Sequence, residues 1–183
     1  MSTLAAGANW PRSSIRALVD TDPTRGVLLV SWLAGFALVV DRMVQHVDRF
    51  PLGIAVLTSL LVGPPVGFAL VFVEALLTTW TGRWLGGQGT FTELRAAHAW
   101  SLVPVLGFLA IASVRATDLT SAESMAPAVA GIVLMVCSQG LAILLVAEVH
   151  GVSLARGIGA LLLAWLLRLV VLFALGAAVI ATI

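Results

Sequence analysis

Long apolar stretches that carry almost no charge limit what this chain can fold into more than any other feature. Five such stretches occur, and a helix needs about 20 apolar residues to cross the hydrocarbon core of a bilayer. The chain is 60% hydrophobic and 10% charged, whereas a soluble domain is about half apolar and about a quarter charged. Because lipid offers the backbone no hydrogen-bond partners, such stretches cross the membrane as helices. The sequence therefore predicts an all-α fold, a polytopic membrane bundle of five transmembrane helices in one domain over residues 1–183.

Polar breaks between the apolar stretches indicate where the spans begin and end. Asp22-Pro23 is typical of a helix start, because aspartate caps the first turn and proline fits the first helical position. Gly151 suits a helix end, since glycine readily adopts the left-handed conformation there. Polar outer turns are expected near 46–51 and 116–124. The spans are then expected at about 24–44, 64–84, 93–115, 125–149 and 154–182.

Residues 1–22 are expected to form a frayed tail and one short amphipathic helix. Residues 11–19 place three apolar side chains on one face and two arginines on another, with Ser13 or Ser14 as the expected N-cap. Such a helix lies at the membrane interface and favours an anionic leaflet. The alternative is a helix that docks onto a partner.

Three prolines interrupt the expected spans. Pro64 and Pro65 follow a glycine and remove two backbone donors. We expect a short helix over 52–62 followed by a span over 64–84, or one kinked helix, while a re-entrant substrate-binding break is the alternative. Pro104 lies well inside the third span and is expected to bend it.

A glycine-rich polar turn separates the second span from the third. Gly86, Gly87 and Gly89 are expected to allow positive φ and a tight reversal. Thr90 followed by Glu93 is the pattern of a capping box, which starts a new helix. The neighbouring tryptophans are typical of an aromatic belt, and two flanking arginines indicate the cytoplasmic side with access to lipid head groups; these residues are Trp80, Trp84, Trp100, Arg83 and Arg95.

Three motifs follow one another in order between Leu60 and Leu167. They are Gly-Gly-x-Gly-(Thr/Ser)-Phe after an apolar span, Ala-Trp-Ser-Leu-x-Pro in the next span, and later Glu-Val-His-Gly-Val-Ser-Leu-Ala-Arg-Gly. In this order they resemble the Yip family, small five-span membrane proteins named in eukaryotes for interacting with Ypt/Rab GTPases. The resemblance implies a non-enzymatic scaffold or trafficking protein with its N-terminus inside.

The resemblance also bears on the partner. Eukaryotic members carry an acidic cytosolic segment before the first span, and residues 1–22 do not resemble it. This difference favours a prokaryotic member in the cell membrane. A small GTPase is expected as a partner only if a eukaryotic-type role applies.

The distribution of arginines predicts the same orientation. All ten basic residues are arginine, and basic residues concentrate in cytoplasmic loops. With the N-terminus inside, six arginines fall on the inner side and three on the outer side, and Arg168 falls within the fifth span. The N-terminus is therefore expected in the cytoplasm and the C-terminus outside.

Two charges inside the spans are expected to be partners. Glu74 lies near the middle of the second span and Arg168 near the middle of the fifth. A charge at the bilayer centre costs about 2.5–3.5 kcal/mol on insertion scales, so each should face protein or water. Small residues share the helical face of each charge, which indicates packing faces. Gln139 on the fourth span is expected to complete the hydrogen bonding.

Other polar residues give weaker signals. Glu148 and His150 lie two residues apart at the inner end of the fourth span, where solvation of the helix end is expected rather than a proton relay. His98 lies near the same interface. No nucleophilic triad, metal-ligand spacing or phosphate-binding motif is found, so we expect no enzymatic activity and no cofactor, and a net charge of +1 gives no case for nucleic acid.

Two function classes remain open. The first is a membrane scaffold that organises the bilayer, other membrane proteins or further copies of itself through its cytoplasmic turns. The second is a small transporter or channel that uses the intramembrane site at Glu74 and Arg168.

Overall fold

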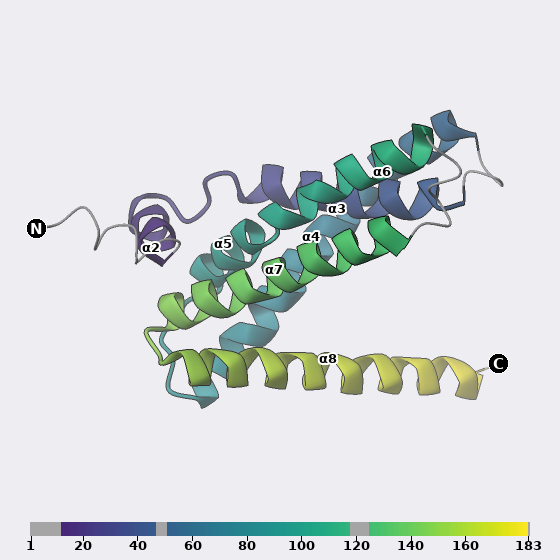
Figure 1. The fold of residues 1–183 in the computed structure, drawn as a ribbon. Coiled ribbons are helices and arrows are strands. Elements are labelled where there is room, and N and C mark those ends of the chain that lie inside the picture. The colour runs from purple at the N-terminus through teal and green to yellow at the C-terminus, as the bar shows by residue number, and fades with distance from the viewer. Residues whose placement is uncertain (1–11, 47–50, 118–124, 183) are drawn as a thin grey trace, which may run out of the picture.

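The computed structural model describes residues 12–46, 51–117 and 125–182, and all regular structure in these ranges is helical. The elements are α2 (Arg12–Thr21), α3 (Val27–Val44), α4 (Leu52–Trp84), α5 (Phe91–Ser101), the 3-10 helix η1 (Val103–Gly107), α6 (Phe108–Thr117), α7 (Met125–His150) and α8 (Leu154–Thr182), arranged as in Figure 1. Five helical segments are long and apolar enough to span a membrane, with α5, η1 and α6 counted together. The expected all-α, five-span architecture is thus confirmed.

The first span begins later than expected. Gly26 precedes α3 with a φ of 71°, a conformation that glycine adopts without strain. Asp22 caps a short turn instead, because its Oδ1 accepts hydrogen bonds from the backbone N–H (2.9 Å) and the hydroxyl (2.7 Å) of Thr24. These bonds hold the pKa of the Asp22 carboxyl below its usual value.

The second span is one continuous helix of 33 residues. Pro64 and Pro65 lie inside it, so the separate helix over 52–62 and the re-entrant break are both wrong, whereas the expected alternative of one helix through the prolines is confirmed. Gly63 lies against α3, and a Cβ there would come within 2.6 Å of the Phe36 Cα. Close packing against a neighbouring helix is a setting in which proline is tolerated inside a membrane span.

The third span is more disrupted than the expected bend. The α-helix ends at Ser101, and Pro104 lies in the 3-10 helix that leads to α6. Proline has no N–H for the carbonyl four residues earlier, which explains the loss of α-helical bonding at this point. The third span is therefore two α-helices joined by η1.

The N-terminal helix packs onto the bundle. It begins at Arg12, so Ser13 and Ser14 lie inside it and neither is the N-cap. Ile15 is buried among residues of α5 and α7. Arg16 donates to the Glu148 backbone carbonyl at 2.8 Å and forms an ion pair with its carboxylate at 3.1 Å.

The two ends of the bundle differ in how they are connected. We call the end that carries α2, the segment Leu85–Thr90 and the turn after His150 the turn end, on the left of Figure 1. At the other end Arg115 of α6 donates to the Asp41 carboxylate of α3 at 2.7 Å. Of the two outer turns expected at this end, residues 47–50 and 118–124 lie outside the described ranges.

Candidate functional site

The two intramembrane charges meet between α4 and α8. The Arg168 guanidinium donates from Nη1 to Glu74 Oε1. The small residues expected on both packing faces are buried, namely Gly63, Gly67, Thr78 and Thr81 on α4 and Gly157, Ala160 and Ala164 on α8. Glu74 lies ten residues before the end of α4, about 15 Å along the axis at 1.5 Å per residue. That is about half the thickness of a bilayer core.

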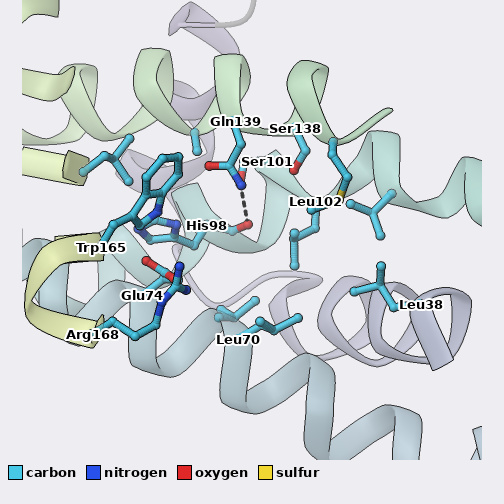
Figure 2. Close-up of a pocket in the computed structure, with 15 residues that line it drawn as sticks. Leu38, Leu70, Glu74, His98, Ser101, Leu102, Ser138, Gln139, Trp165 and Arg168 are labelled. Atoms are coloured by element: carbon cyan, nitrogen blue, oxygen red, sulfur yellow. Dashed lines mark hydrogen bonds and ion pairs between the residues drawn. The ribbon is translucent and has the colours of Figure 1, made fainter. Parts of the chain in front are cut away.

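A cavity of about 170 Å³ adjoins this ion pair. Every span contributes to its wall, with Leu38 from α3, Glu74 from α4, Ser101 from α5, Ser138 from α7 and Arg168 from α8. Figure 2 shows Ser138 and Gln139 across the cavity from the pair. A mostly apolar cavity with a few convergent polar groups, placed where all five spans meet, is the strongest candidate for a site within the membrane.

Gln139 does not complete the ion pair as expected. Its side chain lines the same cavity and, in Figure 2, points from α7 toward His98. Within the described ranges, however, no hydrogen bond joins it to Glu74 or Arg168, and Glu74 Oε2 is buried without a partner. Gln139 therefore lies on the expected inward face of α7 but forms no hydrogen bond with the pair.

The glycine turn works differently from the expected reversal. Of its three glycines only Gly86 has a positive φ, 85°, and the Gly87 N–H donates to the Gly82 carbonyl at 2.8 Å to close α4. This is the hydrogen bond of a Schellman motif. The expectation of positive φ at Gly87 and Gly89 is wrong, and both residues are small for another reason.

That reason is the imidazole of His150, which is enclosed by the turn. A Cβ on Gly87 would lie 2.5 Å from its Nδ1, one on Gly89 would lie 3.0 Å from it, and one on Gly82 would overlap the ring. The Gly89 N–H donates to Nδ1 at 3.1 Å. Since Nδ1 accepts, Nε2 carries the proton and donates to the Thr78 carbonyl at 3.0 Å.

Thr78 connects the enclosed side chain of His150 to the cavity. Its hydroxyl donates to the Glu74 carbonyl at 2.7 Å and lies 2.9 Å from Nε2 of His98, which lines the cavity. Both histidines are buried, so the expected solvation of a helix end is wrong. Sequence reasoning missed this link, although Thr78 lies on the same helical face as Glu74 and one turn away.

Glu148 and His150 take different partners. Glu148 pairs with Arg16, whereas His150 turns into the glycine segment. The turn-end pocket beside them has a volume of about 390 Å³ and is lined by both Arg16 and His150, together with Gln88 and Glu93. Glu148, through its ion pair with Arg16, and His150, through its bond to Gly89, therefore both help to fix the wall of this pocket.

The capping box at the start of α5 is confirmed. The Thr90 N–H donates to Glu93 Oε2 at 2.7 Å, and the Glu93 N–H donates to the Thr90 hydroxyl at 3.4 Å. Arg83 is exposed, as access to lipid head groups requires. Arg95 instead lies over the ring of Phe72, 5.2 Å from its centroid, a cation–π contact that directs it into the protein.

The three tryptophans expected in an aromatic belt differ in exposure. Trp80 and Trp84 are exposed on α4. Trp100 is half-buried, and its ring lies 3.3 Å from where a Cβ on Gly26 would stand. Trp100 therefore packs inside the molecule, where the chain before α3 passes over α5.

The buried ion pair of Asp41 and Arg115 was also missed. Gln45 donates to the second Asp41 oxygen at 2.8 Å, so both carboxylate oxygens have partners. The available signal was helical spacing, because Asp41 follows Ala34 and Ala37 on one buried face of α3. In the part of the chain that the structure describes, no group of three or more His, Cys, Asp and Glu could hold a metal ion.

Comparison with known proteins identifies the family. No curated protein and no solved structure matches the chain. The model of the Yip1 domain matches residues 9–176, almost the whole chain. The Yip1 family is a non-enzymatic membrane trafficking family. The chain, with its five candidate membrane spans, belongs to the Yip1 domain family.

Proposed function

We propose that this chain is a membrane adaptor that binds another membrane protein through its turn end, on the cytoplasmic side. One observation carries the proposal: His150 ties the glycine turn to α7 and α4 through hydrogen bonds to Gly89 and Thr78. The Gln88 N–H also donates to the His150 carbonyl at 3.2 Å. Segments far apart in sequence are thereby held in one fixed arrangement.

Rigid presentation of polar groups favours recognition. A surface that is already ordered loses less conformational entropy when a partner binds. The turn-end pocket presents Arg16 and Gln88 beside backbone groups of Gly86 and Gly151. The excess of arginines in the segments at this end supports the cytoplasmic orientation. A small GTPase belongs to this proposal only for a eukaryotic-type role, and we propose a prokaryotic member.

Site-specific photo-crosslinking in the native membrane tests the adaptor. A photoreactive residue at exposed Gln88 should give a discrete adduct, whereas one at exposed His46, at the far end, should not. His150→Ala releases the turn and should reduce the Gln88 adduct at unchanged protein level. Equal adducts at both positions, or no effect of His150→Ala, would contradict the proposal.

The cavity favours a second candidate, a small transporter. Intramembrane charges that face a cavity are typical of substrate and ion pathways. Proteoliposome flux of ions and small solutes measures this candidate directly. A flux higher than that of protein-free vesicles, and lost in Glu74→Gln, would support transport. If the protein is fully incorporated into the vesicles and no such flux is measured, the transporter is excluded and the adaptor is the remaining candidate.

A further inference from the structure

The cavity beside Glu74 and Arg168 lies where a membrane span is broken. Ser101 ends α5, and Val105 lies in η1, directly after Pro104; both line the cavity. The α-helix gives way here to a 3-10 helix, and such local departures from α-helical bonding are tolerated at membrane depth where neighbouring protein encloses them or they line a cavity. Broken spans that line such a space also form the binding sites of many membrane proteins.

The charges of the cavity wall limit the ligand to a neutral molecule. Arg168 and Glu74 already form an ion pair and neutralise each other. A cationic ligand would stand beside Arg168 and an anionic one beside Glu74, and each would leave net charge deep in the membrane. Apart from this pair the wall is built from neutral groups, so the charge of a bound ion would not be balanced there.

The polar groups of the wall suit a hydroxyl. Ser138 and Gln139 line the cavity, and within the described ranges their side chains form no hydrogen bond with another protein group. Each can both donate and accept, as a hydroxyl does. Much of the remaining wall is apolar and includes Leu70, Leu102 and Leu161.

The volume sets the size of the ligand. At about 170 Å³ the cavity resembles an engineered cavity of about 150 Å³ that binds benzene. We propose that this cavity binds a small uncharged amphiphile, one ring in size, whose hydroxyl pairs with Gln139 and Ser138. The inference does not depend on the adaptor proposal, because it requires no partner protein.

Binding of 4-fluorophenol and 4-fluorotoluene to the purified full chain in micelles, followed by fluorine NMR, tests this site. The two probes have similar size and differ in the hydroxyl. 4-Fluorophenol should show a saturable bound signal, absent from empty micelles, with about fivefold tighter binding than 4-fluorotoluene, the usual effect of one hydrogen bond. Equal affinities, or no saturable signal, would overturn the proposal.

Two variants locate the bound probe. Ala142→Phe fills the cavity and should abolish the saturable signal. Gly140→Phe, two residues away, is the matched control, because Gly140 is exposed and a Cβ there meets nothing within 4 Å. Equal loss in both variants would place the probe outside the cavity and refute the site.

A third variant covers the case in which Ala142→Phe does not fold. Gln139→Leu removes the amide without breaking a hydrogen bond between described residues. It should lower the affinity for 4-fluorophenol about fivefold and leave that for 4-fluorotoluene unchanged. A parallel change for both probes would contradict a hydroxyl pairing at Gln139.

Discussion

His150 accounts for the glycines around it. Glycine was expected at Gly87 and Gly89 for backbone freedom, yet both positions are occupied by glycine because the imidazole fills the space of a Cβ. Gly86, one residue earlier, does use its backbone freedom. Neighbouring glycines in one turn therefore have different physical causes, which substitutions can separate.

Gly87→Ala should lower the free energy of unfolding because its Cβ must displace the His150 ring, breaking the hydrogen bond from Gly89. In a His150→Ala background the same substitution should cost at least about 1 kcal/mol less, since contacting residues couple by about 0.5–3 kcal/mol. Chemical unfolding of the four proteins in a double-mutant cycle measures this coupling.

Gly86→Ala is the control for that cycle. It should cost about 1–2 kcal/mol from left-handed strain, and equally in both backgrounds, because the nearest atom to a Cβ there is Arg156 Nη1 at 3.8 Å. Coupling of Gly86→Ala to His150→Ala, or no coupling for Gly87→Ala, would contradict the enclosure of the His150 imidazole by the glycine turn.

At the level of elements, the helices are joined by close backbone contacts and by buried polar ties. A Cβ on Gly35 of α3 would lie 2.8 Å from the Gly67 Cα of α4, so the two backbones touch. The Thr81 hydroxyl of α4 lies 2.8 Å from the Ala160 carbonyl of α8. The ion pair of Glu74 and Arg168 is the tie between these same two helices deeper in the bundle.

Arg168→Met should destabilise the protein by about 3 kcal/mol, because it leaves the largely buried Glu74 carboxylate without its partner. Glu74→Leu should destabilise it less, because the Arg168 side chain that it leaves unpaired is partly exposed. The double variant should recover much of that loss. Unfolding free energies of the three variants test the pairing, with Arg42→Met as a control that should change stability by less than about 0.5 kcal/mol, since Arg42 is exposed. Losses that simply add in the double variant would show that the two residues are not energetic partners.

At the level of the whole molecule, the bundle is closed at the turn end and more open along the last helix. Figure 1 shows α8 diverging from α7 toward the C-terminus. Side chains from Leu169 to Ala174 are all exposed, an apolar surface suited to lipid. Contacts of α2, the glycine turn and His150 hold the opposite end together.

Orientation is the prediction at this scale. In a Cys137→Ser background, single cysteines at exposed His46 or Thr117 should react with an impermeant maleimide in intact cells. Cysteines at exposed Gln88 or Ser153 should react only after permeabilisation, because the arginine excess lies on their side. Labelling of the Gln88 position in intact cells would reverse the proposed topology.

Local patterns were sufficient for much of this protein. Apolar length predicted the five spans, and the spacing of Thr90 and Glu93 predicted the cap of α5. Helical periodicity put Glu74 and Arg168 on small-residue faces, which the bilayer forces to turn inward. Each of these properties depends on the chain within a few turns and on the membrane as solvent.

Apart from the pairing of Glu74 with Arg168, the contacts between helices were decided only by the tertiary structure. The enclosure of His150, the contact of Arg95 with Phe72 and the pairing of Asp41 with Arg115 each join residues from different helices. Pro64 stays inside a continuous helix, although local chemistry favours a break there. Such outcomes depend on the distance and rotation between helices, and packing of the whole bundle sets these because no single span contains that information.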